Sequence, residues 1–176
     1  MKKLKLATIW FDGCSGCHMS LLDLDGALIP IVRKADIVYG PLVDAQEFPE
    51  DVDVTLVEGA ISTQVDVERL KQIRGRSKVL VSLGDCAVTG NVAAMRNTIP
   101  VNKLLQRVYV EGADADPGIP HDGLPQLAKL ARPAHDFVKV DVCLPGCPPQ
   151  TKLIAGLLNS VLEGRKPEAG QKIKFG

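Results

Sequence analysis

Residues 4–17 read LKLATIWFDGCSGC and combine a short apolar run with a pair of closely spaced cysteines. The run over residues 4–11 predicts a β-strand that is apolar along its whole length, and the turn signal Asp12-Gly13 ends it. The stretch that follows, residues 19–34, carries leucine, isoleucine and valine at roughly helical spacing. A strand, a turn that holds C-x-x-C and a helix are the beginning of a β–α unit.

The same alternation of apolar strands and helices continues along the chain. Further strands are predicted at residues 36–39, 53–57, 78–83 and 138–144. One helix is predicted to begin at Ser62 or Thr63, and a last helix is predicted over residues 149–163. Continuous apolar strands separated by helices are typical of a parallel sheet that is covered on both faces. We therefore predict one flavodoxin-like α/β domain over residues 1–176, a doubly wound parallel sheet with helices on both faces.

One stretch departs from this regular alternation. Residues 100–134 include a long connection rich in proline, glycine and aspartate, which reads GADADPGIPHDG over residues 112–123. Long connections in compact domains are usually functional or lie at interfaces. We expect residues 100–134 to form an irregular loop at an interface with another protein.

Composition narrows the classes of function. The chain has 176 residues, and its 21 lysines and arginines balance its 21 aspartates and glutamates, so the formal charge is zero. This balance gives no positively charged surface for nucleic acid. The sequence has no run of about 18 apolar residues, so no membrane span is predicted. The amino terminus lacks the cleavage-site pattern of a signal peptide, so we expect a cytoplasmic protein. Disulfides are rare in that compartment, so clustered cysteines there indicate metal binding or redox chemistry.

Four of the five cysteines follow predicted strands. Cys14 and Cys17 come after the first strand, Cys86 after the fourth and Cys147 after the fifth. In a parallel sheet these positions meet at the carboxyl edge, where open α/β sheets bind their ligands. A glycine lies within two residues before each of them, which lets the backbone approach a bulky group. The pattern predicts one common site for the four thiols.

Three chemistries suit such thiols: an iron–sulfur cluster, a zinc site and thiol redox chemistry. The spacing favours a cluster, because an α/β domain does not need zinc to fold and because C-x-x-C redox chemistry leaves Cys86 and Cys147 unexplained. FMN is not expected, since Cys14 and Cys17 occupy the loop that would cradle its phosphate. No G-x-G-x-x-G follows a strand, so direct NAD binding is not expected either. Cys143 lies inside the fifth strand and reads as a small buried side chain, yet geometry alone does not choose between it and Cys147.

Four short motifs, taken in order, resemble those around the proximal cluster of [NiFe]-hydrogenase small subunits. They are Gly13-Cys14-Ser15-Gly16-Cys17, Val57-Glu58-Gly59-Ala60, Gly84-Asp85-Cys86 and Gly146-Cys147-Pro148-Pro149. The resemblance covers roughly residues 4–160 and assigns Cys147, not Cys143, as a ligand. It implies one [4Fe–4S] cluster whose irons are bound by Cys14, Cys17, Cys86 and Cys147. The chain is most similar to the one-cluster small (delta) subunit of soluble NAD-reducing, or bidirectional, hydrogenases.

The resemblance also implies partners. The hydrogen-activating NiFe centre would lie in a separate [NiFe]-hydrogenase large subunit, and iron–sulfur and flavin (diaphorase) subunits would carry electrons on to NAD. The main alternative is the homologous cluster subunit of respiratory complex I, a quinone-linked NADH dehydrogenase. That subunit has two adjacent cysteines in its first motif, whereas two residues separate Cys14 from Cys17 here. Small subunits of other one-cluster cytoplasmic hydrogenases, F420-linked or sulfur-reducing, also fit the motifs.

Other polar residues near these motifs have simpler interpretations. Glu58 ends the third strand at the predicted cluster edge, where it could relay protons or act as a helix-capping or interface carboxylate. We expect His18 to be a surface or capping histidine. Asp12 and Asp85 are expected to be turn residues.

Overall fold

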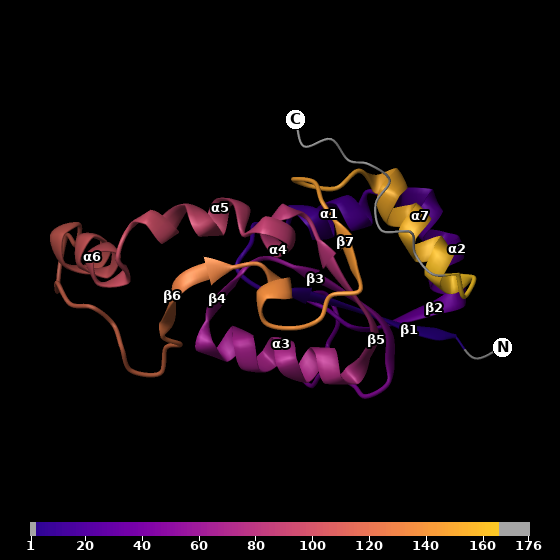
Figure 1. Ribbon diagram of the computed structural model, residues 1–176, viewed down its shortest axis with the longest axis horizontal. Helices are drawn as coiled ribbons and strands as arrows, with labels where there is room; N and C mark the ends of the chain where they lie inside the picture. The colour runs from indigo at the N-terminus through magenta and orange to yellow at the C-terminus, as the bar shows by residue number, and fades with distance from the viewer. Residues whose placement is uncertain (1–2, 166–176) are drawn as a thin grey trace.

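Five parallel strands form the central sheet in the computed structural model, which describes residues 3–165 (Figure 1). Across the sheet they are β2 (Ala35–Tyr39), β1 (Leu4–Trp10), β3 (Val52–Glu58), β5 (Ser77–Leu83) and β7 (Val142–Leu144). Counted along the chain, these strands take the order 2-1-3-4-5, which is the flavodoxin-like arrangement. The predicted fold class is therefore confirmed.

The strands end together at one edge of the sheet. Trp10 at the end of β1 pairs with Glu58 at the end of β3, and Glu58 pairs with Leu83 at the end of β5. Leu83 in turn pairs with Leu144 at the end of β7. Because all these pairs are parallel, the loops that follow the four strands leave from the same side. We call this side the carboxyl edge.

Helices cover both faces of the sheet, and in Figure 1 they lie above and below the strands. On one face lie α1 (Gly16–Leu22), the 3-10 turn η1 (Asp25–Ala27), α2 (Leu28–Lys34) and α7 (Thr151–Leu162); on the other lies α3 (Gln64–Arg76). One apolar core includes Leu21, Ile31 and Ile154. The second core includes Leu70 and Ile73 of α3. The inner strands β1, β3 and β5 are largely buried on both faces, which explains why their sequences are apolar without alternation.

The start of α3 follows the predicted signal. Thr63 is the N-cap: its side chain accepts a hydrogen bond from the backbone N–H of Asp66, and the Asp66 carboxylate accepts one from the Thr63 N–H. This reciprocal capping box satisfies two backbone donors that the helix itself leaves unpaired. Of the two predicted starting residues, Thr63 is the cap.

The single helix predicted over residues 19–34 is wrong, because the chain forms α1, η1 and α2 instead. Asp25 adopts a positive φ of 48° between the two helices. Pro30 lies in the first turn of α2, where its missing N–H costs nothing. In one continuous helix the same proline would stand in the interior and clash with the preceding turn.

The last strand is also shorter than the predicted residues 138–144. Its ladder with β5 covers only Val142–Leu144. Just before this strand, the Asp141 carboxylate accepts a hydrogen bond from the Leu80 N–H at 2.8 Å. A side-chain oxygen therefore takes the place of the backbone carbonyl with which a longer strand would pair. Val138 and Val140 pack partly buried against the α3 core and account for the apolar pattern there.

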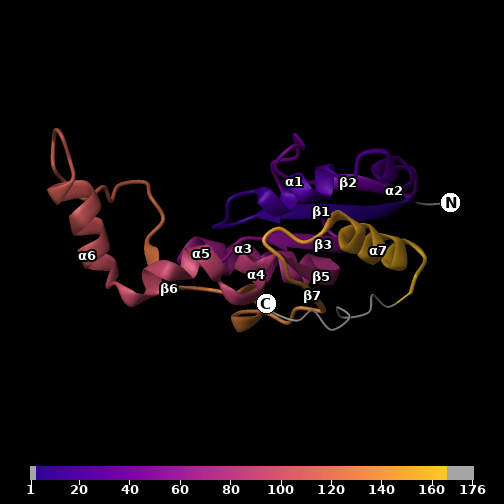
Figure 2. The ribbon, with the colours of Figure 1, turned by 90° about the horizontal axis from the view of Figure 1, so that it is seen from above.

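An elongated part of the chain, residues 91–132, extends from the carboxyl edge away from the sheet in both views (Figure 1 and Figure 2). We call these residues the arm. It follows α4 (Asp85–Thr89), precedes the short turn η4 (Ala134–Asp136), and contains α5 (Asn91–Ala94), η2 (Met95–Thr98), α6 (Val101–Gln106), the π-helical turn η3 (Arg107–Glu111) and β6 (Leu127–Arg132). β6 pairs antiparallel with β4 (Ile61–Thr63). The expectation of an irregular loop over residues 100–134 therefore holds only for residues 112–126, which form neither helix nor strand.

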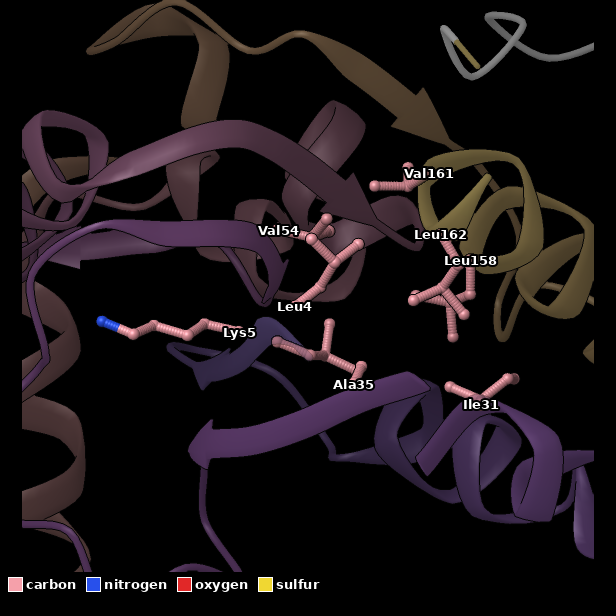
Figure 3. A pocket seen from close by; sticks show the side chains of 9 residues that line it. Leu4, Lys5, Ile31, Ala35, Val54, Leu158, Val161 and Leu162 are labelled. Atoms are coloured by element: carbon pink, nitrogen blue, oxygen red, sulfur yellow. The ribbon is translucent and has the colours of Figure 1, made fainter. Parts of the chain in front are cut away.

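The opposite edge of the sheet holds a small apolar gap beside α2 and α7 (Figure 3). Its volume is about 10 Å³, close to the smallest space that holds one water. Lys5 is the one charged residue of its lining, and the Lys5 amino group turns away to donate to the Glu50 carbonyl at 2.9 Å. This gap is a packing feature of the core.

Among residues 3–165, no helix has the length and apolar character needed to cross a membrane.

Candidate metal centre

The four predicted ligand residues lie in three loops at the carboxyl edge. Cys14 is in the loop after β1, and Cys17 is in the first turn of α1. Cys86 is in α4, directly after β5, and Cys147 is in the loop after β7. Cys17 is buried, with 8% of its surface exposed, while Cys14 and Cys147 are exposed.

The four thiols are close enough to influence one another's ionisation. Burial raises the pKa of Cys17 to about 12, and the negative charges of Glu58, Cys86, Cys14 and Cys147 add to this effect. Burial also raises the pKa of Cys86, with smaller contributions from Cys147, Cys14 and Glu58. Because a raised pKa favours the protonated thiol, a metal that binds the Cys17 and Cys86 sulfurs would have to displace their protons.

Cys143 stands apart from this group. Burial alone raises the pKa of Cys143, without a contribution from another thiol. In β7 it pairs with Ser82, while its neighbours Val142 and Leu144 belong to the core under α1, α2 and α7. Since side chains alternate along a strand, the Cys143 side chain points to the opposite face of the sheet. The structure thus brings together the four predicted thiols and leaves out the fifth.

Gly84 fixes how closely the loops approach. Its φ of 91° and ψ of 173° lie in a region that is open essentially to glycine alone. A Cβ atom at this position would lie 2.3 Å from Cys17 Sγ and 3.2 Å from the Gly146 carbonyl oxygen. The glycine therefore leaves the space in which the sulfur of Cys17 lies beside the Cys86 and Cys147 loops.

Hydrogen bonds tie these loops to one another. The Asp85 carboxylate accepts the Gly146 N–H at 2.7 Å, and the Asp85 N–H donates to the Gly146 carbonyl at 3.2 Å. Ser20 of α1 donates through its hydroxyl to the Pro149 carbonyl at 2.6 Å. The Cys147–Pro148 peptide bond, one residue before Pro149, is cis. Asp85 is therefore a clamp between two of the cysteine loops. The sequence suggested only a turn residue, because its partner lies 61 positions away.

Glu58 is the most deeply buried charged side chain of the site, with 1% of its surface exposed. Its Oε2 accepts the backbone N–H of His18 at 3.0 Å and also contacts His18 Nδ1. Because His18 is in the first turn of α1, Glu58 caps that helix from β3, one of the roles expected for it. Of the two roles expected for His18, a surface or a capping histidine, the surface role is wrong, since the side chain is only 14% exposed. Within the described residues, His18 Nε2 is buried without a hydrogen-bond partner.

Two further donors face the thiols from the start of the arm. The side-chain amide of Asn91 donates to Cys147 Sγ at 3.5 Å. The backbone N–H of Val92 stabilises the Cys86 thiolate, although burial outweighs it. Sequence reasoning missed both residues; the turn signal Gly90-Asn91, shortly after Cys86, could have indicated a reversal of the chain there.

The residues at this edge fit a multi-iron cluster. Four thiols are the donor set of a [4Fe–4S] cluster, Gly84 leaves room where a Cβ would intrude, and amide groups face two of the sulfurs. In residues 3–165, no three histidine, cysteine, aspartate or glutamate side chains converge tightly enough to hold a single metal ion.

Fold and site together define a flavodoxin-like domain with a four-thiol centre at its carboxyl edge. The chain belongs to the family described as NADH ubiquinone oxidoreductase, 20 Kd subunit, whose model matches residues 14–161.

Relatives within this family include hydrogenase subunits. A subunit of the vhu F420-non-reducing hydrogenase of Methanocaldococcus jannaschii is 39% identical over 172 residues, which are 97% of this chain and 60% of that protein. The delta subunit of the NAD-reducing hydrogenase HoxS of Cupriavidus necator is 38% identical over 168 residues, 93% of this chain and 80% of that protein. The chain thus spans less than two thirds of the first of these relatives. The resemblance predicted from the four motifs is confirmed.

Solved structures show the same relationship. A chain of an NAD+-reducing [NiFe]-hydrogenase in the H2-reduced state superposes with a TM-score of 0.92 and 35% identity, covering 99% of this chain and 100% of that chain. A chain of the [NiFeSe]-hydrogenase of Dm. baculatum shares the fold at a TM-score of 0.64 and 19% identity, covering 99% of this chain and 68% of that chain. The second likeness is one of fold alone.

Proposed function

We propose that this protein is the electron-transferring small subunit of a cytoplasmic NAD-reducing [NiFe]-hydrogenase. One observation carries the proposal. Cys14, Cys17, Cys86 and Cys147 gather at one edge of a chain that matches an NAD+-reducing [NiFe]-hydrogenase chain at a TM-score of 0.92. The separation of Cys14 from Cys17 by two residues favours a hydrogenase over the complex I subunit, in which these cysteines are adjacent.

We propose that the four cysteines hold one [4Fe–4S] cluster. When bound, such a cluster takes up and releases single electrons, and its potential depends on charge, burial and hydrogen bonds to the sulfurs. A zinc ion would need four sulfurs about 2.3 Å from one point, and the described residues offer no such convergence. The loops carry the thiols, Gly84 keeps backbone close to Cys17 Sγ, and Asp85 holds the Cys147 loop in register with Cys86.

The large subunit with the NiFe centre is the proposed partner at the carboxyl edge. Apolar side chains at the carboxyl edge and at the start of the arm are exposed, from 46% for Trp10 at the end of β1 to 72% for Met95 in η2. Met19 and Val92, which follow Cys17 and Cys86 in the chain, are also more than half exposed. Exposed apolar groups gathered around a polar site mark protein interfaces. Iron–sulfur and flavin diaphorase subunits are the proposed route onward to NAD.

The arm is the second proposed contact region. Val108, Tyr109 and Leu124, within residues 100–134, are exposed apolar side chains on a segment that extends away from the sheet. An arm of this kind buries little against its own domain, and a partner surface would cover it. The interface role expected for residues 100–134 from their sequence stays a prediction, which this exposure supports.

Glu58 is proposed to position the first loop rather than to touch a reactant. Its carboxylate holds the His18 N–H, one residue after Cys17, and so sets the entry of α1. A role in proton relay stays a prediction. In a Glu58→Gln protein, the amide oxygen can still accept the His18 N–H, so we expect normal assembly; a loss of hydrogen turnover in the assembled complex would indicate the relay.

The ligand assignment is tested by single substitutions in the complex purified without oxygen. Cys86→Ala and Cys147→Ala should each remove or convert the cluster, which lowers the iron and sulfide content and changes the EPR spectrum of the reduced complex. Cys143→Ala is the matched control, because its thiol lies on the other face of the sheet and should leave the cluster unchanged. A Cys147→Ala complex with wild-type iron, sulfide and EPR signal would overturn the assignment.

A further inference from the structure

The turn that joins α4 to α5 brings two N–H donors to two different cysteines. α4 ends at Thr89, and Gly90 follows with a φ of 91° in the left-handed region. Asn91 also has a positive φ, 33°, at the start of α5. Two successive residues of this kind end α4 at once instead of letting the helix continue.

Asn91 contacts Cys147 although 56 positions separate the two residues. Its Nδ2 is 3.5 Å from Cys147 Sγ, a normal distance for a hydrogen bond to sulfur. The next residue, Val92, directs its backbone N–H at the Cys86 thiolate. One short turn thereby serves ligands from two of the three cysteine loops.

Asparagine suits this position for two reasons. It is among the few non-glycine residues that adopt a positive φ at modest cost. Its side-chain amide also carries donors, whereas the nearly isosteric aspartate carries only acceptors when ionised. A donor at a thiolate stabilises the state with more negative charge, which for a cluster is the reduced state.

We propose that Asn91 is a positioning residue that raises the reduction potential of the cluster through its hydrogen bond to the Cys147 sulfur. The proposal rests on the proposed function, because it needs a cluster at the four thiols. The backbone N–H of Val92 acts in the same direction at Cys86.

The test is a potentiometric titration of the cluster by EPR in the anaerobically purified complex, with Asn91→Gly and Asn91→Asp. Glycine tolerates the positive φ and only removes the donor, so the equilibrium constant for reduction should fall roughly tenfold, or ~59 mV for one electron. Aspartate fills the same space but places a carboxylate at the sulfur, so its potential should fall further. Asn159→Asp is the matched control: it makes the same charge change at an exposed position in the second half of α7, outside both proposed contact regions, and should leave the potential unchanged.

The order of the three potentials separates this role from a merely structural one. If Asn91 only tied the turn to the Cys147 loop, the isosteric aspartate would lie closer to the wild type than glycine does, and that order would overturn the proposal. Unchanged potentials in both variants would overturn it as well. If a variant fails to assemble, pulsed EPR of the wild-type complex labelled with 15N-asparagine decides: we expect a 15N coupling to the reduced cluster, and its absence refutes the bond. A wild-type complex without any cluster signal would instead refute the proposed function.

Discussion

Gly84 is the position at which the smallest substitution should have the largest effect. An alanine there must adopt φ 91° and ψ 173°, a conformation that costs a non-glycine residue about 1–3 kcal/mol. Its Cβ would also lie 2.3 Å from Cys17 Sγ, whereas non-bonded heavy atoms of this size normally stay about 3.5 Å or more apart. The sulfur would have to move by roughly 1 Å, or the Cys147 loop would have to open.

The magnitude follows from these two contributions. Overpacking of a filled interior typically costs about 1–3 kcal/mol, so with the backbone cost the Gly84→Ala chain should be destabilised by about 2–6 kcal/mol. That is a large part of the ~5–15 kcal/mol that stabilises an ordinary domain. The displaced sulfur should also bind iron poorly. We therefore expect both a lower unfolding temperature and a loss of iron and sulfide.

The assay is iron and sulfide content per chain, with thermal unfolding of the same anaerobically purified complex. Gly156→Ala is the matched control, since Gly156 is in the middle of α7 and a Cβ there would meet nothing within 4 Å. In a helix interior alanine is more stable than glycine by about 0.5–1 kcal/mol, so this variant should keep its cluster and unfold slightly later. A Gly84→Ala complex with wild-type iron content and unfolding temperature would show that Gly84 is not needed to hold Cys17 Sγ in place.

Three further predictions concern single side chains. Thr63→Ala removes the N-cap of α3 and should cost about 1 kcal/mol in thermal unfolding with no change in iron content; an unchanged unfolding temperature would argue against the cap. Asp85→Ala should lower iron content because the clamp between two cysteine loops is lost, and Asp85→Asn, which keeps an acceptor, should restore most of it. Burial of Asp141 opposes ionisation, but the Leu80 N–H and the Arg74 guanidinium outweigh it and hold the pKa of that carboxyl below its usual range. Its contribution to stability is therefore present above the unfolded pKa of about 3.9 and is lost as the pH falls through the lower folded value. Asp141→Asn should flatten the acid limb of a stability-against-pH curve measured by circular dichroism; an equally steep limb would contradict this.

The sheet could be predicted from the sequence because its signals are local. Each parallel strand is a short apolar run between turn residues, and β1, β3 and β5 lie within one residue of their predicted bounds. The cysteines could be placed at one edge for the same reason, since each follows a strand that can be recognised on its own. The parallel topology then brings these positions together, because parallel strands share a carboxyl edge.

The parts that sequence reasoning missed depend on contacts between distant residues. The pairing of β4 with β6 joins Ile61 to Arg132 and has no local signature. The Asp85 clamp and the Asn91 donor likewise join loops that lie more than fifty residues apart. The break in the predicted helix over residues 19–34 had a local signal in Pro30, which apolar spacing alone overlooks.

The choice between Cys143 and Cys147 shows what spacing in the sequence can decide and what it cannot. Spacing left the two cysteines exchangeable, and only the resemblance to a family separated them. In the folded chain the difference is one of strand geometry: Cys143 is within β7 and points away, while Cys147 is past the end of the strand and lies beside the other thiols.

In the proposed function this chain transfers electrons from a partner's NiFe centre. The most direct test is the nickel and iron content of the complex that co-purifies with the chain under anaerobic conditions. We expect nickel in a fixed ratio to the chain, with about four irons per chain beyond those of the other partners. Iron without nickel would contradict it and would favour a quinone-linked dehydrogenase subunit.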